Sequence, residues 1–228
     1  MLRDTPGPNN SQTEKHREIT ESLIRNRKDM SLVIYVMNAT NLAVDSDKKL
    51  LESIAKEMKK NGKQAKDRFL FVINKADSWI EGENQTVEEL LIETRKYLKK
   101  FEIVNPNLFP VSASLANRIW MKMDGHTFKY NIQELLNVKI NHFSISGDTQ
   151  THFENFATLS PSSRETINGD LQKAVDEEDN NKIALIHTGI PALEIVINEY
   201  LDKYAYPIKI AEAVEEFQNI IDEKKMRS

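Results

Sequence analysis

The chain of 228 residues contains no cysteine, which excludes disulfide bonds and thiolate metal sites and fits a reducing compartment. Its seven glycines are few, and none belongs to a G-x-x-x-x-G-K-[ST] phosphate-binding loop. No apolar run approaches the roughly 18 residues that a transmembrane helix needs. The net charge of −4 offers no strong positive field to nucleic acid. What remains, 39% hydrophobic and 29% charged, is typical of a soluble, helix-rich protein.

Three short apolar runs, at residues 32–37, 69–73 and 108–111, predict strands. The first two are apolar at successive positions, which is typical of parallel strands buried on both faces. Pro110 interrupts the third run, and because proline cannot donate to a ladder, we expect this strand at the edge of the sheet.

Helical patterns alternate with these runs. Residues 19–24 have helical spacing, and Asp45 or Ser46 can cap a helix that Asn61-Gly62 can end. Thr86, followed three residues later by Glu89, predicts a capping box at the start of another helix. The alternation predicts an α/β fold with about three parallel strands and right-handed crossovers.

The pattern changes after Ala113. Residues 115–188 are polar and predict a mostly helical insertion, with helices near 132–143 and 164–178. Pro191 opens a strong helix within 189–206, and Pro207 is expected to interrupt it. Residues 207–228 then predict a bundle or neck helix. Its apolar seam consists of Ile210, Val214, Phe217 and Ile221. Membrane contact is the alternative for this helix, but its polar face is mixed in sign, which disfavours anionic lipid.

The sequence Asn74-Lys75-Ala76-Asp77 fits N-K-x-D and directly follows the second apolar run. Guanine presents two donors side by side, N1–H and the 2-amino group, and the Asp77 carboxylate can accept both. Adenine lacks this donor pair, so a site built on a buried carboxylate rejects it. Lys75 would lay its methylene stem over the base, and Asn74 would bond to the neighbouring phosphate-side loop. Ligands bind at the carboxyl ends of parallel strands, which is where this motif is expected to lie.

Two further motifs accompany it. Asp4-Thr5-Pro6-Gly7 fits D-x-x-G, in which Asp4 would hold Mg²⁺ through water and the Gly7 N–H would reach the γ-phosphate. Ser112-Ala113 follows the third apolar run, and backbone N–H groups there can donate to guanine O6.

Together these motifs resemble the G domain of dynamin-like large GTPases in their bacterial branch. The resemblance runs from Asp4 to about Ser114 and resumes at 189–194. It implies that residues 1–114 are the C-terminal two-thirds of a P-loop GTPase-type domain, that 189–206 is its last helix and that 207–228 begins a neck. Asp4, Gly7, Asn74, Lys75, Asp77, Ser112 and Ala113 are carried over as nucleotide-binding residues, with Asp4 at the metal. No catalytic residue is assigned, and Pro8 stands where many small GTPases have glutamine.

The resemblance implies binding of GTP or GDP with Mg²⁺ in the full-length protein. It also implies GTP hydrolysis coupled to self-association through the G domain. The expected location is cytoplasmic, with a peripheral place at the inner membrane face as an extension, and no nucleic-acid partner is expected. Two alternatives remain open. One is a non-catalytic G-like interaction module, and the other is a small-GTPase-type regulator without membrane function.

Other polar groups predict no site. The five histidines, His16, His126, His142, His152 and His187, lack metal-ligand spacing and are expected on the surface. The basic cluster at Lys59, Lys60, Lys63, Lys66 and Arg68 is expected to be a solvated helix end and loop.

Overall fold

The computed structural model describes Ser22, Ile24 and residues 31–42, 48–60, 66–81, 85–145, 147, 149–207, 210, 211 and 213–218.

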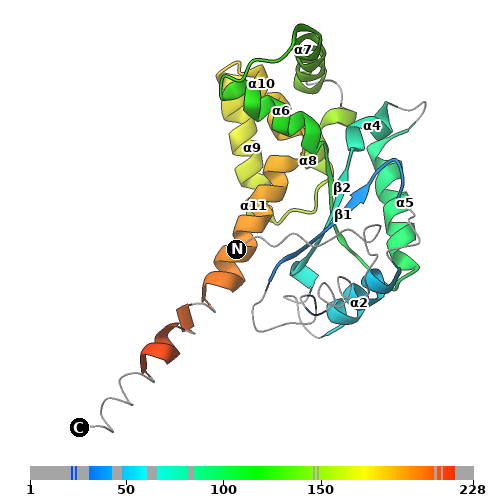
Figure 1. Ribbon diagram of the computed structural model, residues 1–228, viewed down its shortest axis with the longest axis vertical. Helices are drawn as coiled ribbons and strands as arrows, with labels where there is room; N and C mark the ends of the chain where they lie inside the picture. The colour runs from blue at the N-terminus through cyan, green and yellow to red at the C-terminus, as the bar shows by residue number, and fades with distance from the viewer. Residues whose placement is uncertain are drawn as a thin grey trace.

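A parallel three-stranded sheet forms the centre of the molecule (Figure 1). Its strands are β1 (Val33–Asn38), β2 (Phe69–Asn74) and β3 (Asn107–Val111), arranged in that order. β1 and β2 pair in register from Val33 opposite Phe69, and β2 and β3 from Leu70 opposite Asn107. The predicted parallel sheet is confirmed, and so is the edge position of the strand that contains Pro110.

Helices connect the strands as the alternating pattern predicts. α2 (Lys48–Met58) follows β1, and α4 (Ala76–Ile80) and α5 (Val87–Lys99) follow β2. The capping box of α5 is confirmed, because Thr86 Oγ1 accepts from Glu89 N at 3.2 Å and Glu89 Oε2 accepts from Thr86 N at 3.1 Å. The proposed caps of α2 lie outside the described residues. These elements establish the α/β fold class.

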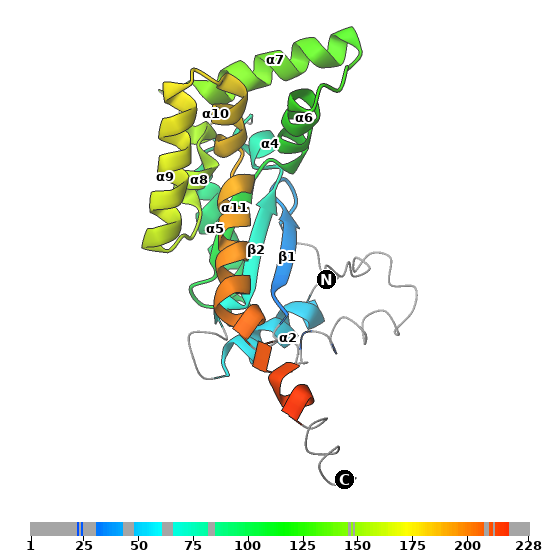
Figure 2. The same ribbon diagram turned by 90° about the vertical axis from the view of Figure 1, so that its left-hand side faces the viewer.

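A group of helices follows β3 and lies mostly beyond the carboxyl ends of the strands (Figures 1 and 2). In chain order they are α6 (Ala113–Met123), α7 (Tyr130–Ser144), the 3₁₀ turn η3 (Thr149–Thr151), α8 (Phe153–Phe156), α9 (Pro161–Asp176) and α10 (Asn180–His187). The predicted helices near 132–143 and 164–178 correspond to α7 and α9. The local sequence pattern did not predict α6, α8 and α10.

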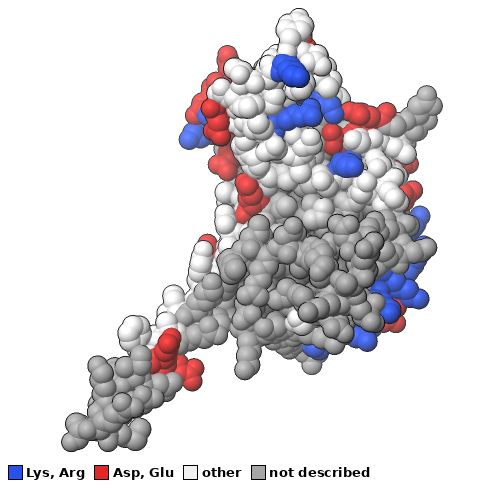
Figure 3. All heavy atoms as spheres, viewed as in Figure 1, with Lys and Arg blue, Asp and Glu red and all other residues white. Residues whose placement is uncertain are grey.

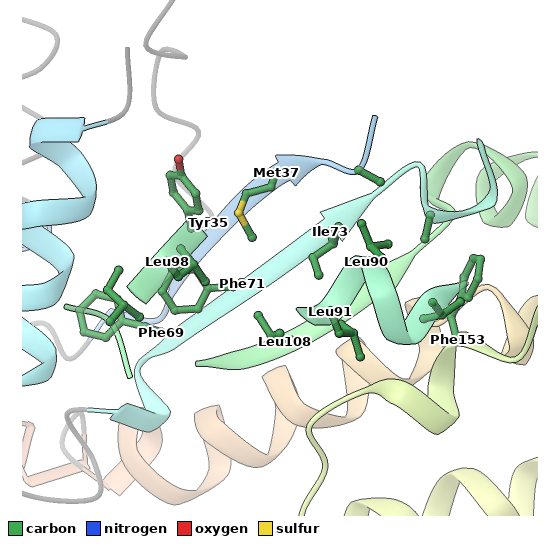
Figure 4. Packing of buried hydrophobic residues seen from close by; sticks show 14 of the residues in the cluster. Tyr35, Met37, Phe69, Phe71, Ile73, Leu90, Leu91, Leu98, Leu108 and Phe153 are labelled. Carbon is green, nitrogen blue, oxygen red and sulfur yellow. The ribbon is translucent and has the colours of Figure 1, made fainter. Parts of the chain in front are cut away.

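The side chains of β2 separate two apolar cores, because successive residues of a strand point to opposite faces. Phe69, Phe71 and Ile73 pack toward α5 in one core. Figure 4 shows them close to Leu90 and Leu98 of that helix. Leu70 and Val72 belong to the other core, with side chains from β3, α9, α10 and α11 (Ile190–Tyr200). β2 is therefore buried on both faces, as predicted.

The prediction of burial on both faces is wrong for β1. Tyr35 and Met37 are buried, but Val36 is 59% exposed. The second core gathers on β2 and β3, so the Val36 side of β1 lies at the margin of that core.

The prediction of a solvated basic cluster is wrong at Arg68. This residue is buried and donates to the carbonyl oxygens of Ser31 at 2.7 Å and Ile24 at 2.8 Å. Lys59, Lys60 and Lys66 are exposed, as expected.

The outer edge of β3 is bonded by the helical segment. Leu108 N donates to Thr158 Oγ1 at 3.0 Å, and Leu108 O accepts from Thr158 N at 2.9 Å. Ser112 N, just past the strand, donates to Thr188 O at 3.0 Å. Pro110 has no N–H to satisfy, so it fits an edge that only short segments cover.

The last helix departs from the prediction near its end. α11 begins as predicted, with Pro191 in its first turn, but its α-helical part ends at Tyr200 and continues as the π-helical turn η4 (Leu201–Ala205). In a regular α-helix the Pro207 ring would clash with the carbonyl of Lys203. The π-helical turn lies just before Pro207, where a regular α-helix would produce this clash. Beyond it, Ile210, Val214 and Phe217 are all exposed, and Ile221 lies outside the described residues.

Described basic side chains form small groups beside acidic ones on the face shown in Figure 3. The fields of neighbouring opposite charges largely offset one another, and salt screens what remains beyond a Debye length of about 8–10 Å. This face therefore has no large field of one sign over its described residues.

We expect the free edge of β1 to be protected. In the described part of the chain, β1 pairs with β2 and otherwise forms only one isolated bridge, from Asn38 to Asn41, and a bare apolar edge is a template for pairing with another chain. Self-association, or cover by another segment of the chain, is expected to slow hydrogen exchange at residues 32–37. Light scattering across concentration, with exchange along β2 as the slow reference, tests this. A dilute monomer that exchanges fast along all of β1 would contradict it.

Candidate functional site

The predicted base-recognition residues lie at the carboxyl ends of β2 and β3. Asn74 ends β2, and Ser112 directly follows β3. Because the strands are parallel and adjacent, their two loops meet at one edge of the sheet. α4 and α6 leave the sheet there, and α7 lies beyond them (Figures 1 and 2).

Asn74 joins the loops after all three strands. Its Oδ1 accepts from Lys75 N at 2.8 Å and from Ala113 N at 3.2 Å. Its backbone oxygen accepts from Ala39 N, past the end of β1, at 2.9 Å. The predicted bond of Asn74 to a phosphate-side loop is not among these contacts. The side chain instead connects the N-K-x-D loop to the Ser112–Ala113 loop.

Lys75 stands in the left-handed region, with φ of 64°, and caps the start of α4. This conformation is uncommon for a residue other than glycine, and it costs roughly 1–2 kcal/mol. The bond from Lys75 N to Asn74 Oδ1 helps to hold it. The Lys75 side chain is exposed, so its methylene stem is accessible to a flat ligand.

The Asp77 carboxylate is mostly buried in the first turn of α4 and faces a cation from α7. Its Oδ2 lies 3.3 Å from Lys139 Nζ, which also lies 3.1 Å from Glu81 Oε1. Burial by itself lowers the pKa of the Lys139 ammonium. The hydrogen bonds and charges of Glu81 and Asp77 outweigh burial and raise that pKa. Lys139 therefore stays charged at neutral pH, and it loses its charge, and with it the ion pair, as the pH rises through the raised pKa.

Sequence reasoning did not find Lys139. Nothing in the spacing of α7 connects it to a motif more than sixty positions earlier, and only the packing of α7 near α4 brings the two charges together.

The backbone of Ser112 and Ala113 is already engaged. Ser112 N bonds to Thr188 O, and Ala113 N bonds to Asn74 Oδ1. Donation from these groups to guanine O6 would require an exchange of partners. The Ser112 hydroxyl is buried and has no hydrogen-bond partner, although Ser112 is the N-cap of α6. A buried hydroxyl without a partner is costly, which is a feature found at ligand sites.

Asp4 and Gly7, the predicted Mg²⁺ and γ-phosphate residues, lie outside the described residues. The described geometry therefore concerns the base-recognition side of the predicted site.

The expectation of surface histidines is wrong for two of the five. His152 and His187 are buried, and they lie beside the buried Glu154. His126 and His142 are exposed as expected, and His16 lies outside the described residues. The sequence separates His152 and His187 by 35 positions, so no local spacing signals their proximity.

Comparison with known proteins finds no family model, no curated protein and no solved structure that matches this chain. Within the described residues, no helix is both long and apolar enough to cross a membrane. Inference about function therefore depends on the motifs and on the geometry of the sheet edge.

Proposed function

We propose that this chain binds the base of a guanine nucleotide at the carboxyl ends of β2 and β3, as part of a dynamin-like GTPase. The observation that carries the proposal is the Asn74 side chain, which bonds to Lys75 N and Ala113 N at once. A polar turn that merely followed a strand would not need to connect the N-K-x-D loop to the Ser112–Ala113 loop.

Each residue has a distinct role in this proposal. The Asp77 carboxylate accepts from guanine N1–H and the 2-amino group, and the Lys75 stem covers the base. α6 begins at Ala113, whose N–H bonds to Asn74 Oδ1, and the N–H groups that follow in the first turn of a helix have no partner within the helix. They supply donors for guanine O6 near the Asn74 bridge. In the full-length protein, Mg²⁺ and the phosphates are assigned to Asp4 and Gly7, with self-association through the G domain.

Competition binding tests the proposal. A fluorescent GDP analogue bound to the chain should be displaced by GDP and not by ADP, because adenine leaves the Asp77 carboxylate without its two donors. Equal displacement by ADP and GDP would exclude a guanine site. The measurement should use high protein concentration, because a chain without a G-x-x-x-x-G-K-[ST] loop is expected to bind phosphates weakly.

We expect no measurable GTP hydrolysis by these 228 residues. The loop whose N–H groups and lysine cradle the β- and γ-phosphates is absent from the sequence, and no water-positioning glutamine follows Gly7. Phosphate release should equal the buffer background. Turnover above background that Asp77→Asn abolishes would contradict this expectation.

A non-catalytic interaction module is the second candidate, and the ion pair between Asp77 and Lys139 favours it. The carboxylate that would read guanine already has a cationic partner at 3.3 Å. In this alternative, the pair serves only to attach α7 to α4.

Lys139→Met separates the two candidates. If Lys139 competes with guanine for the Asp77 carboxylate, its removal should strengthen GDP binding roughly two- to five-fold, the range expected for a partly exposed ion pair. Lys122→Met is a matched control, because Lys122 likewise reaches a neighbouring helix, from α6 to α7, but bonds there to the neutral Asn137 side chain. Absent GDP binding in folded Lys139→Met protein, as judged by circular dichroism, would favour the interaction module, and unchanged binding would show that Lys139 does not compete with guanine.

A further inference from the structure

Three ionisable side chains meet in the helical part of the molecule, away from the Asp77 site. His152 precedes α8 as its N-cap, Glu154 lies within α8, and His187 ends α10. Their exposed fractions are 8%, 2% and 3%. One potential ligand atom from each lies within 4.8 Å of the others. Charged residues are seldom buried so fully without a compensating partner.

Two hydrogen bonds orient the imidazole rings. His187 Nδ1 lies 2.9 Å from Glu154 Oε1. His152 Nε2 lies 3.3 Å from Ile145 O. A carbonyl oxygen only accepts, so Nε2 of His152 carries the proton in this bond, and Nδ1 is the nitrogen that a neutral ring would offer to a metal. Histidine ligands of metal ions are commonly oriented in this way, with one ring nitrogen donating to a backbone carbonyl.

The second oxygen of Glu154 is available to a positively charged ligand. Glu154 Oε2 is buried and has no hydrogen-bond partner. Arg164 is close in the chain, but its guanidinium donates to the backbone oxygens of Glu154 and Ala157 at 2.7 and 3.1 Å. An unpaired carboxylate oxygen at this depth is costly, and a bound cation would compensate it.

The rings of His152 and His187 stack, with centroids 3.7 Å apart and planes 7° apart. A nitrogen lone pair lies in its ring plane, so two parallel rings cannot both point at one ion between them. Ligand atoms around a tetrahedral Zn²⁺ stand about 3.3 Å apart, given bonds of about 2.0–2.1 Å. Binding of one ion by both rings therefore requires the rings to turn apart.

We propose that His152, Glu154 and His187 form a Zn²⁺ site that fastens the start of α8 to the end of α10. Two imidazoles and one carboxylate suit a borderline divalent ion. Three protein ligands leave the fourth position to a water molecule. An ion here would also stabilise the fold, because α8 and α10 adjoin Thr158, which bonds to β3, and Thr188, which bonds to Ser112 just past β3. None of these three ligands is among the residues proposed to bind the nucleotide.

Zinc binding by the full chain after removal of metal with a chelator tests this. Equilibrium dialysis should find one Zn²⁺ per chain, and Zn²⁺ should raise the melting temperature, since an ion that binds only the folded state stabilises it. Glu154→Gln keeps an acceptor for His187, and His187→Gln keeps a polar side chain of similar reach. Each should weaken Zn²⁺ binding at least about ten-fold. His126→Asn, which removes an exposed histidine, is the matched control and should leave binding unchanged.

A measurement on the unaltered chain guards against variants that fail to fold. Long-range ¹H–¹⁵N spectra of the histidine rings should show two rings shifting with one equivalent of Zn²⁺, and ring contacts between His152 and His187 should be lost. No bound equivalent, equal binding by folded Glu154→Gln and His187→Gln, or shifts confined to other histidines would each overturn the proposal.

Discussion

Gly189→Ala is expected to destabilise the protein by roughly 2–5 kcal/mol, the sum of left-handed strain and overpacking. Gly189 has φ of 76°, and a Cβ there would lie 2.4 Å from Pro110 O and 3.1 Å from Phe153 Cβ. Neither neighbour can withdraw easily, because one is the backbone of β3 and the other is a fully buried side chain. For a chain of this size the melting temperature should fall by roughly 5–15 °C.

Two other glycines provide matched controls. Gly125 has φ of 82° but nothing within 4 Å of its Cβ position, so Gly125→Ala should cost only the strain, roughly 1–2 kcal/mol. Gly169 lies inside α9 in open space, and Gly169→Ala should stabilise the helix by about 0.5–1 kcal/mol. Thermal and urea unfolding of the three variants measures the series. Equal losses for Gly189→Ala and Gly125→Ala would show that the approach to Pro110 has no energetic consequence.

The loop around Gly189 also bears on the candidate site. Thr188 O accepts from Ser112 N, so the close approach of this loop to β3 helps to hold the segment that begins α6. A larger residue at position 189 would push Thr188 away from Ser112. We therefore expect Gly189→Ala to weaken nucleotide binding as well as the fold.

Asp77→Asn is expected to change which purine nucleotide the chain prefers. The amide cannot accept from both guanine donors, and its NH₂ group can donate to the 2-oxo group of xanthine. Sites that read a base by buried hydrogen bonds discriminate by up to about 10⁴–10⁵. In this partly exposed site we expect GDP affinity to fall at least about 100-fold, with XDP displacing the fluorescent probe better than GDP.

Two controls separate base recognition from loss of the ion pair. Asp77→Ala should lose GDP binding without gaining XDP binding. Glu81 is the other carboxylate partner of Lys139, and the Glu81 side chain is 62% exposed. Glu81→Gln should therefore leave the GDP preference intact. If Asp77→Asn keeps the wild-type order of GDP and XDP, the carboxylate does not read the base.

Local sequence signals predicted the elements that depend on interactions between residues close together in the chain. The uninterrupted apolar run at 69–73 predicts a strand buried on both faces. Thr86 with Glu89 predicts a helix start, because these two side chains bond to each other's backbone N–H groups. α6 was missed although Leu115, Ala116 and Ile119 have helical spacing, since the polar composition of the segment suggested an insertion with weak structure.

The candidate site likewise combines features that the sequence predicts with contacts that depend on packing. That Asn74, Lys75 and Asp77 lie just past a parallel strand follows from the chain itself, because the motif directly follows the apolar run. That Asn74 bonds to Ala113, and that Lys139 faces Asp77, depends on how β3 and α7 pack against this edge. Ala113 and Lys139 lie tens of residues away from Asn74 and Asp77 along the chain, so the spacing of a local motif cannot predict these contacts.

The amino-acid sequence by itself determined the class of this protein: an α/β chain with three apolar strands, capped helices and an N-K-x-D motif at a strand end. These features rest on side-chain periodicity and on hydrogen bonds between neighbours in the chain. Only the tertiary structure decided that Val36 is exposed, that Arg68 is buried and that His152, Glu154 and His187 meet in the interior. Burial and the meeting of distant charges are properties of packing, because each depends on which surfaces the folded chain brings together.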